Sequence, residues 1–111
     1  METIQASDFQ KLDIRVGTVL EARDFPEARK PALQLTVDFG PAGVKRSSAQ
    51  ITDYYLTDDL VGRQVIGLVN LPPRLIAGFS SECLILGVYD AEGKVVLLQP
   101  DKPMDNGSKI G

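Results

Sequence analysis

Apolar and polar residues alternate with a period of two along several short segments of the chain. Residues 14–21 show this alternation first, and residues 33–39 repeat it further along. Such a period is typical of a β-strand that buries one of its faces. Residues 44–51 follow a turn at Gly40 to Gly43, so we expect them to pair with 33–39 as a hairpin. The first half of the chain therefore predicts three strands.

Two later segments, residues 64–69 and 83–89, are apolar on both faces. One face of an antiparallel sheet normally meets water, so strands of this kind indicate that something covers the second face. The chain has no spare helix for this purpose, and we therefore expect a second copy of the chain to cover it. A sixth short strand is predicted at 95–98, after a turn at 91–94.

Only two helical turns are expected. Ser7 and Gln10 have the spacing of a capping box for one turn, and Thr57 can cap a second turn that Gly62 ends. Gly17, in the middle of the first strand, predicts a bulge or a sharp bend. Five or six short strands with one or two short helical turns predict an all-β chain that forms a small closed OB-fold β-barrel. A length of 111 residues fits one domain over residues 1–111.

The composition argues against catalysis. The chain has no histidine and a single cysteine, Cys83, so the commonest general base and the commonest transition-metal ligand are missing and no intrachain disulfide can form. Asp58 and Asp59 are adjacent, and a place at the start of the second helical turn accounts for both. No Gly-rich loop suited to phosphates occurs. We therefore do not expect an enzyme, a metal site or a cofactor.

The N-terminal residues and the cysteine content predict a cytoplasmic protein. The N-terminal residues lack the basic and apolar regions of a secretory signal, and the single cysteine fits a reducing compartment. Apolar runs such as residues 65–69 are far shorter than the roughly 20 residues that cross a bilayer.

The charge is weakly acidic, with a net charge of −3 and a pI of about 4.8. Nucleic-acid binders often have a basic balance or a basic stripe. Any basic patch must come mainly from the first half of the chain, where Arg29-Lys30 and Lys45-Arg46 form doublets.

Residues 70–79 connect the two apolar segments and are unusually hydrophobic for a loop. In one interpretation, Leu75, Ile76 and Phe79 plug the end of the barrel or seal a dimer. In the other, the connection lines an apolar groove for a client, with Arg74 and Asn70 as its polar anchors. The two interpretations are compatible.

Glu82 stands at the edge of an apolar strand, where a carboxylate requires a partner for its charge. Arg74 or backbone amides could provide that partner. The carboxylate could then act as a structural strut or as a contact to a ligand.

Several runs of residues occur in the order found in a known family. Leu12 to Gly17, Val37 to Gly40, Asn70 to Pro73 and Ser81-Glu82 together resemble the tRNA-binding domain family, an OB-fold found free-standing and fused to methionyl-tRNA synthetase. Within that family the chain resembles the CsaA branch specifically, through residues 25–32, 47–52 and 77–79. The resemblance extends over about residues 9–111.

The resemblance implies a homodimeric chaperone that binds unfolded or precursor polypeptides for protein export, without ATP, with the export machinery as a further partner. The expected polypeptide-binding residues are Lys45, Gln50, Asn70, Arg74, Phe79, Ser81 and Glu82. The alternative is a tRNA- or RNA-binding module, free-standing or acting beside an aminoacyl-tRNA synthetase, whose contacts would be Arg29, Lys30, Lys45, Arg46 and Arg74. The tRNA-binding relatives carry a Ser-Glu-Gly-Met run and a more basic surface, whereas this chain has Ser81-Glu82-Cys83-Leu84, so the chaperone is expected.

Overall fold

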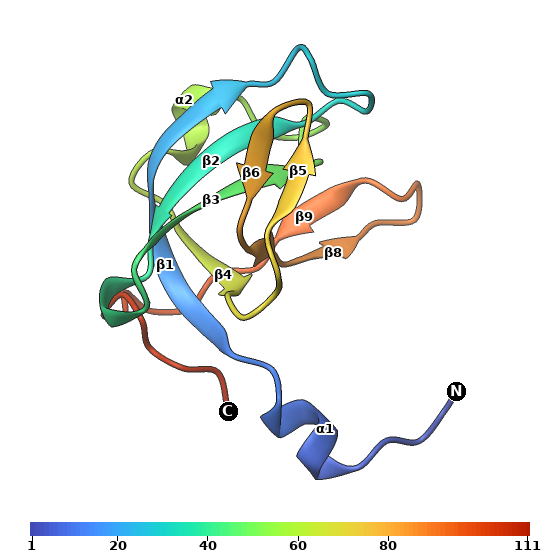
Figure 1. Cartoon of the computed structure of the whole chain (residues 1–111), viewed down its shortest axis with the longest axis vertical. Coiled ribbons are helices and arrows are strands. Elements are labelled where there is room, and N and C mark those ends of the chain that lie inside the picture. The colour runs from blue at the N-terminus through green and yellow to red at the C-terminus, as the bar shows by residue number, and fades with distance from the viewer.

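Five antiparallel strands form the main sheet in the computed structural model, which describes residues 1–111 (Figure 1). In spatial order the strands are β3 (Val44–Ala49), β2 (Leu33–Asp38), β1 (Ile14–Asp24), β4 (Gln64–Leu68) and β7 (Leu84–Ile85). The sheet curls so that the chain just before β7 meets β3. There the Glu82 N–H donates to the carbonyl of Arg46 at 2.7 Å, and Ser47 Oγ donates to the carbonyl of Cys83 at 2.9 Å. The predicted small OB-fold barrel is thereby confirmed.

The alternation in β2 produces the core. Leu33, Leu35 and Val37 point inward and are buried, and Phe39 just beyond the strand is buried as well. A Cβ atom on Gly17 would lie 2.7 Å from Phe39 Cδ1, and one on Gly67 would lie 2.6 Å from Phe39 Cζ. Both glycines therefore leave room for the aromatic ring, because real Cβ atoms do not approach that closely.

Of the bulge or sharp bend predicted at Gly17, the bulge is absent. The pairing of β1 with β4 is regular through Gly17, and the register shift in β1 lies between Val19 and Glu21, where the strand changes its pairing with β2. Glycine is needed at position 17 because the side chain of Phe39 approaches it closely. Such an approach requires no irregularity in the pairing of the strand.

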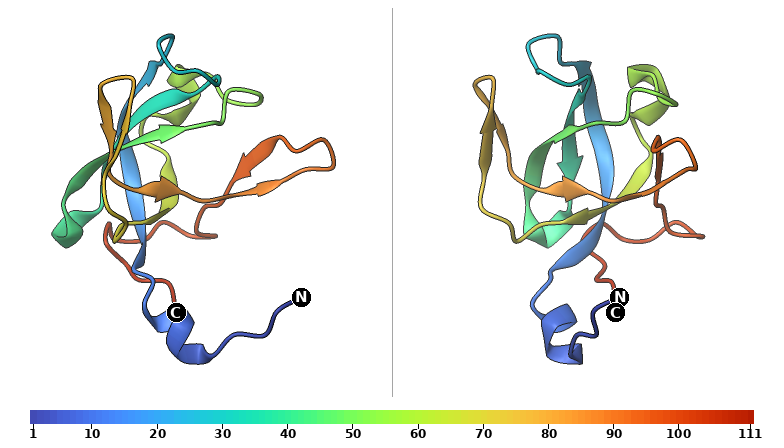
Figure 2. Two further views of the ribbon diagram at one scale, coloured as in Figure 1. Left: turned by 45° about the vertical axis from the view of Figure 1, so that its right-hand side comes forward. Right: turned by 90° about the vertical axis from the view of Figure 1, so that its right-hand side faces the viewer.

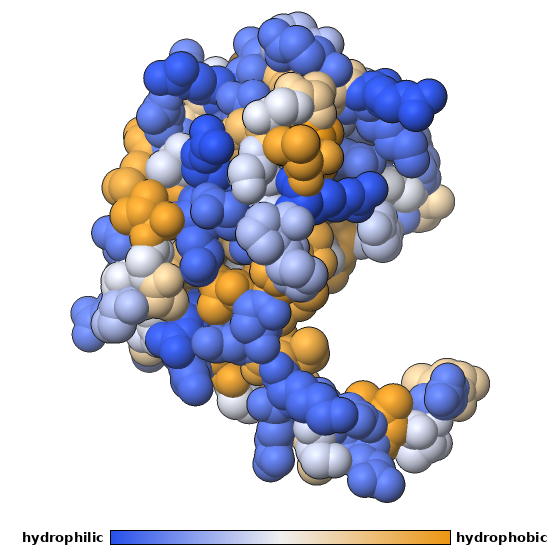
Figure 3. Space-filling model, in the orientation of Figure 1, coloured by the Kyte–Doolittle hydropathy of each residue, from blue (hydrophilic) through white to orange (hydrophobic).

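Two short hairpins extend from the barrel. One consists of β5 (Arg74–Ile76) and β6 (Phe79–Ser81), and the other of β8 (Gly87–Tyr89) and β9 (Val95–Leu97). The first hairpin stands beside β3, whereas Figure 2 shows the second projecting away from the barrel. In Figure 3, apolar side chains interrupt a mainly hydrophilic surface near the first hairpin, where Leu75 is 75% exposed.

The prediction of one continuous strand over residues 83–89 is wrong. The chain divides at Leu86 into β7 and β8, which belong to different sheets. The Leu86 N–H donates to the carbonyl of Ile66 at 2.8 Å, while the Leu86 carbonyl accepts from Leu98 N at 3.2 Å. Leu86 therefore bonds to β4 on one side and to the end of the second hairpin on the other, which turns the chain out of the barrel.

A second copy of the chain was expected to cover the outer apolar faces of residues 64–69 and 83–89. Only one of these two segments has such an exposed face. Residues 65–68 of β4 are buried within a single chain. In contrast, Leu84 is 49% and Tyr89 79% exposed, and Val88 between them is exposed as well. Of the two segments, only residues 83–89 therefore leave apolar side chains uncovered, at Leu84, Val88 and Tyr89.

Both predicted helical turns are present, but neither has the predicted cap. The helix α1 (Ala6–Gln10) begins after Gln5, whose N–H donates to the Asp8 carboxylate at 3.0 Å, and Ser7 lies inside the helix. The helix α2 (Thr57–Leu60) begins after Leu56, and Thr57 is its first residue. The third short helix, η1 (Gly40–Ala42), is a 3-10 turn between β2 and β3. None of these helices could cross a membrane.

Candidate functional site

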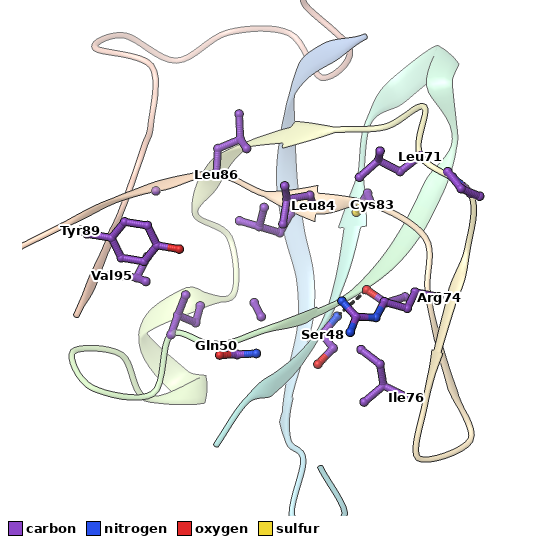
Figure 4. Close-up of a pocket in the computed structure, with 16 residues that line it drawn as sticks. Ser48, Gln50, Leu71, Arg74, Ile76, Cys83, Leu84, Leu86, Tyr89 and Val95 are labelled. Carbon is purple, nitrogen blue, oxygen red and sulfur yellow. Dashed lines mark hydrogen bonds between the residues drawn. The ribbon is translucent and has the colours of Figure 1, made fainter. Parts of the chain in front are cut away.

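A groove of about 550 Å³ opens between β3, the β5–β6 hairpin and the chain from β7 to β9 (Figure 4). Ten of its sixteen lining residues are hydrophobic, so its main capacity is to remove apolar groups from water. The large apolar side chains that line it include Leu71, Ile76, Leu84, Leu86, Tyr89 and Val95. The polar side chains are Ser48, Gln50, Arg74 and Ser81.

The polar side of the groove is held by hydrogen bonds between β3 and β6. The Ser48 N–H donates to Ser81 Oγ at 3.0 Å, the bond drawn in Figure 4. Arg74 stands beside this pair and forms no ion pair. Because Ser81 is occupied with the backbone, the free polar groups here are the Arg74 guanidinium, the Gln50 amide and the Ser48 hydroxyl.

Glu82 serves as a strut between two strands. Its carboxylate accepts from the N–H of Arg46 at 2.9 Å, and its own N–H donates to the carbonyl of the same residue at 2.7 Å. Of the two partners expected for this carboxylate, the backbone amide is therefore the one present, and Arg74 is not. Glu82 lies outside the residues that line the groove.

Phe79 supports the hairpin from behind the groove. Its side chain is only 7% exposed and packs with Phe25, the two ring centroids lying 5.4 Å apart. The guanidinium of Arg46 lies 4.6 Å from the centre of the Phe79 ring, within the range of a cation–π contact. Phe79 thus fixes β6 against the loop of residues 25–32 and does not line the groove.

Asn70 also has a structural partner for each end of its amide. Its Oδ1 accepts from the N–H of Asp13 at 2.9 Å, and its Nδ2 donates to the carbonyl of Lys11 at 2.8 Å. These bonds tie the segment after α1 to the end of β4. Lys45 is half-buried on β3 and lies outside the groove. Of the seven predicted polypeptide contacts, the groove therefore brings together three, namely Gln50, Arg74 and Ser81.

A second hollow, of about 370 Å³, lies between the loop of residues 25–32 and the tip of the β5–β6 hairpin. Arg29, Lys30 and Arg74 line it, and no carboxylate does. Arg46 lines a separate small hollow with Arg23. The structure therefore brings together three of the five residues predicted for RNA binding.

Sequence reasoning missed the groove residues Leu84, Leu86 and Tyr89, because it assigned residues 83–89 to one covered strand. The useful indication was Gly87, which interrupts that apolar run. A Cβ atom there would lie 2.6 Å from Val95 Cγ1, so the glycine allows β8 to approach β9 closely.

Two side-chain environments shift pKa values near the groove. Burial raises the pKa of the Cys83 thiol to about 11, so it stays protonated at neutral pH and behaves as a small apolar group. The Tyr54 hydroxyl donates a hydrogen bond to the Asp90 carboxylate, which lowers the pKa of Asp90 and raises that of Tyr54. This hydrogen bond ties the β8–β9 hairpin to the loop before α2.

Comparison with known proteins places these features in a family. The model of the family described as "Putative tRNA binding domain" matches residues 14–109. The methionine–tRNA ligase of Methanocaldococcus jannaschii is 44% identical over 110 residues, which is 99% of this chain but 17% of the ligase. The chain thus spans about a sixth of the length of that enzyme.

Two solved structures correspond to this chain over their whole length. The chaperone CsaA from Bacillus anthracis is 50% identical with a TM-score of 0.94, covering 99% of this chain and 100% of that one. The CsaA chaperone protein from Picrophilus torridus is 48% identical with a TM-score of 0.91, covering 98% and 100% respectively. The chain therefore belongs to the tRNA-binding domain family and, within it, to the CsaA branch.

Proposed function

We propose that this chain is a chaperone that binds unfolded or precursor polypeptides in the groove. The observation that carries the proposal is the composition of the groove, whose mainly apolar lining ends at the polar groups of Gln50 and Arg74. Apolar side chains of an unfolded polypeptide would leave water there, while the guanidinium and the amide engage its backbone. The CsaA structures that resemble the chain are described as chaperones, which supports the same role.

The binding needs no nucleotide and no chemical step. The ionisable residues that line the groove are Arg74, Cys83 and Tyr89, and the Cys83 thiol is protonated at neutral pH. This set contains no histidine and no carboxylate, the side chains that most often act as general bases. We therefore infer an ATP-independent binding protein of the cytoplasm that delivers its clients for export.

The functional unit would be a homodimer. The β8–β9 hairpin exposes Val88, Tyr89 and Val96 to solvent, and Leu84 extends this apolar surface back to the barrel. Large exposed apolar patches mark interaction sites, and a second copy with the same patch can cover it. Light scattering at micromolar concentration should then give twice the mass of one chain, and a mass of one chain would contradict the dimer.

An RNA-binding module is the second candidate, because Arg29, Lys30 and Arg74 line one hollow without a carboxylate. Binding through phosphates would weaken steeply as salt concentration rises, since each contact releases counterions. A titration of tRNA at increasing salt tests this. Polypeptide binding that changes little with salt, with no measurable tRNA binding, would exclude this candidate.

The groove itself is tested by a matched pair of substitutions. Leu71 is 43% exposed and lines the groove, whereas Leu20 on β1 is 50% exposed and lies outside it. We expect Leu71→Ala to weaken binding of a fluorescently labelled unfolded precursor about five- to tenfold, because part of the apolar surface that the client buries is lost. Leu20→Ala should leave the affinity unchanged. Equal effects of both substitutions, or none, would contradict the assignment.

A further inference from the structure

Three cations gather beside the apolar groove without acidic partners. Arg29, Lys30 and Arg74 line the second hollow, whereas the ion pairs of the chain involve other basic residues, Lys11, Arg15, Arg23 and Lys94. Glu27 is close to Arg29 in sequence but does not line the hollow. The hollow therefore holds positive charge in a protein whose net charge is −3.

The hollow and the groove are adjacent. They share the lining residues Ser48, Gln50, Arg74 and Ile76. Figure 4 shows Arg74, Ser48 and Ile76 together at one side of the groove, with Tyr89 and Val95 at the other. An extended ligand that lies across the shared residues can therefore place apolar groups in the groove and a charged group in the hollow.

We propose that the hollow receives an acidic side chain of the client, so that the chain selects apolar segments with a neighbouring aspartate or glutamate. The inference rests on the proposed function, because it names the class of polypeptide that the groove takes. A carboxylate matches the planar guanidinium groups of Arg29 and Arg74, which can donate two parallel hydrogen bonds each. The side chains of Ser48 and Gln50 add neutral polar groups at the junction.

Charge and shape favour a single carboxylate over a nucleic-acid strand. Sites for single-stranded nucleic acid combine a basic groove with aromatic rings on which successive bases stack. No aromatic side chain lines the hollow. The nearby rings of Phe25 and Phe79 are buried against each other. Neutralising one carboxylate also requires fewer cations than tracking a run of phosphates.

The test compares three labelled peptides that share one unstructured apolar run and differ only in the flanking residues, which are glutamate, glutamine or lysine. Affinities are measured by fluorescence anisotropy for the wild type and for the double variant Arg29→Gln/Lys30→Gln. Both residues line the hollow but not the groove. The control with the same change of net charge is Lys102→Gln/Lys109→Gln, whose lysines are exposed and line neither cavity.

We expect the wild type and the control variant to bind the glutamate peptide about three- to tenfold more tightly than the glutamine peptide, with the lysine peptide weakest. The Arg29→Gln/Lys30→Gln variant should bind the glutamine peptide as the wild type does and lose most of the preference for glutamate. The preference should also shrink at high salt.

Equal affinity of the wild type for all three peptides would overturn the inference and leave the proposed function standing. Failure of every peptide to bind would overturn both. The inference would also be overturned if a single-stranded RNA displaced the glutamate peptide and its own binding were lost in Arg29→Gln/Lys30→Gln, because the hollow would then belong to nucleic acid.

Discussion

The two hairpins beside the groove have strands of equal length but differ in how the barrel holds them. Strand β6 is bonded to β3 through Ser81 and Ser48, and Phe79 packs beneath it against Phe25. The β8–β9 hairpin is held near its base and at Asp90, and the side chains of Val88, Tyr89 and Val96 remain exposed. One hairpin therefore forms a fixed wall of the groove, whereas the other offers a surface that a partner can cover.

The largest expected difference between the hairpins concerns their aromatic side chains. Phe79→Ala should lower the free energy of unfolding by about 3 kcal/mol, because it leaves a cavity beside Phe25. Tyr89→Ala, at a side chain that is 79% exposed, should change the stability of one chain by less than about 0.5 kcal/mol.

Urea unfolding at several protein concentrations separates the stability of one chain from self-association, since only the latter depends on concentration. We expect Tyr89→Ala to reduce the part of the stability that depends on protein concentration. Phe79→Ala should instead reduce the stability of one chain. A large loss from Tyr89→Ala at low concentration would mean that the β8–β9 hairpin is part of the fold of one chain.

A smaller effect is expected at the bond between β3 and β6. Ser81→Ala removes the acceptor of the part-buried Ser48 N–H and should cost about 1–2 kcal/mol. The control is Ser80→Ala on the same strand, because the Ser80 hydroxyl forms no such bond to β3. Thermal unfolding of both variants checks this, and equal melting temperatures would contradict the role given to Ser81.

The turns of the two hairpins should respond differently to the same substitution. Ala77 has φ +46°, a left-handed conformation that asparagine tolerates better than alanine. Ala77→Asn should therefore raise the free energy of unfolding by about 0.5 kcal/mol. Ala91, in the other turn, has no positive φ, and Ala91→Asn should have no stabilising effect. Urea unfolding checks both, and stabilisation by Ala91→Asn alone would show that the two turns have been assigned wrongly.

The smallest effect is the pH dependence of the tether at Asp90. The hydrogen bond from Tyr54 lowers the pKa of Asp90 below 3.8 and raises the pKa of Tyr54 above 10.0. A lowered carboxyl pKa contributes stability at pH values above 3.8 and loses it as the carboxylate protonates, and a raised phenol pKa contributes stability below pH 10.0 and loses it as the phenol ionises. The tether should therefore persist between these limits.

Absorbance titration in a Tyr55→Phe/Tyr89→Phe background isolates the ionisation of Tyr54. We expect Asp90→Asn to return the pKa of Tyr54 toward 10.0. The same pKa with and without the Asp90 carboxylate would show that the tether does not form.

The strands that the sequence predicted well are those whose pattern depends on neighbours in the sequence. The alternation of residues 33–39 predicted β2 because each inward residue packs in one barrel core. The β5–β6 hairpin was missed, because its turn places alanine where asparagine or glycine would have marked it. The break at Leu86 depends on bonds to Ile66 and Leu98, which no local pattern reveals.

The candidate site was predictable only in part for the same reason. Gln50 and Arg74 were identified as binding residues and do line the groove. Phe79 and Asn70 were chosen because they belong to a hydrophobic connection, yet their side chains contact the body of the protein. The gathering of Arg29, Lys30 and Arg74 required the folded chain, because it brings a loop and a hairpin far apart in sequence to one hollow.

The most direct test of the central claim is photo-crosslinking to an unfolded precursor polypeptide. A benzophenone amino acid would replace Leu71, which is exposed and lines the groove, and in a second variant Leu20, which is exposed on β1 outside it. If the groove is the binding site, position 71 should form a covalent adduct that excess unlabelled polypeptide suppresses. Position 20 should form none. Adducts of equal yield from both positions, or from position 20 alone, would contradict it.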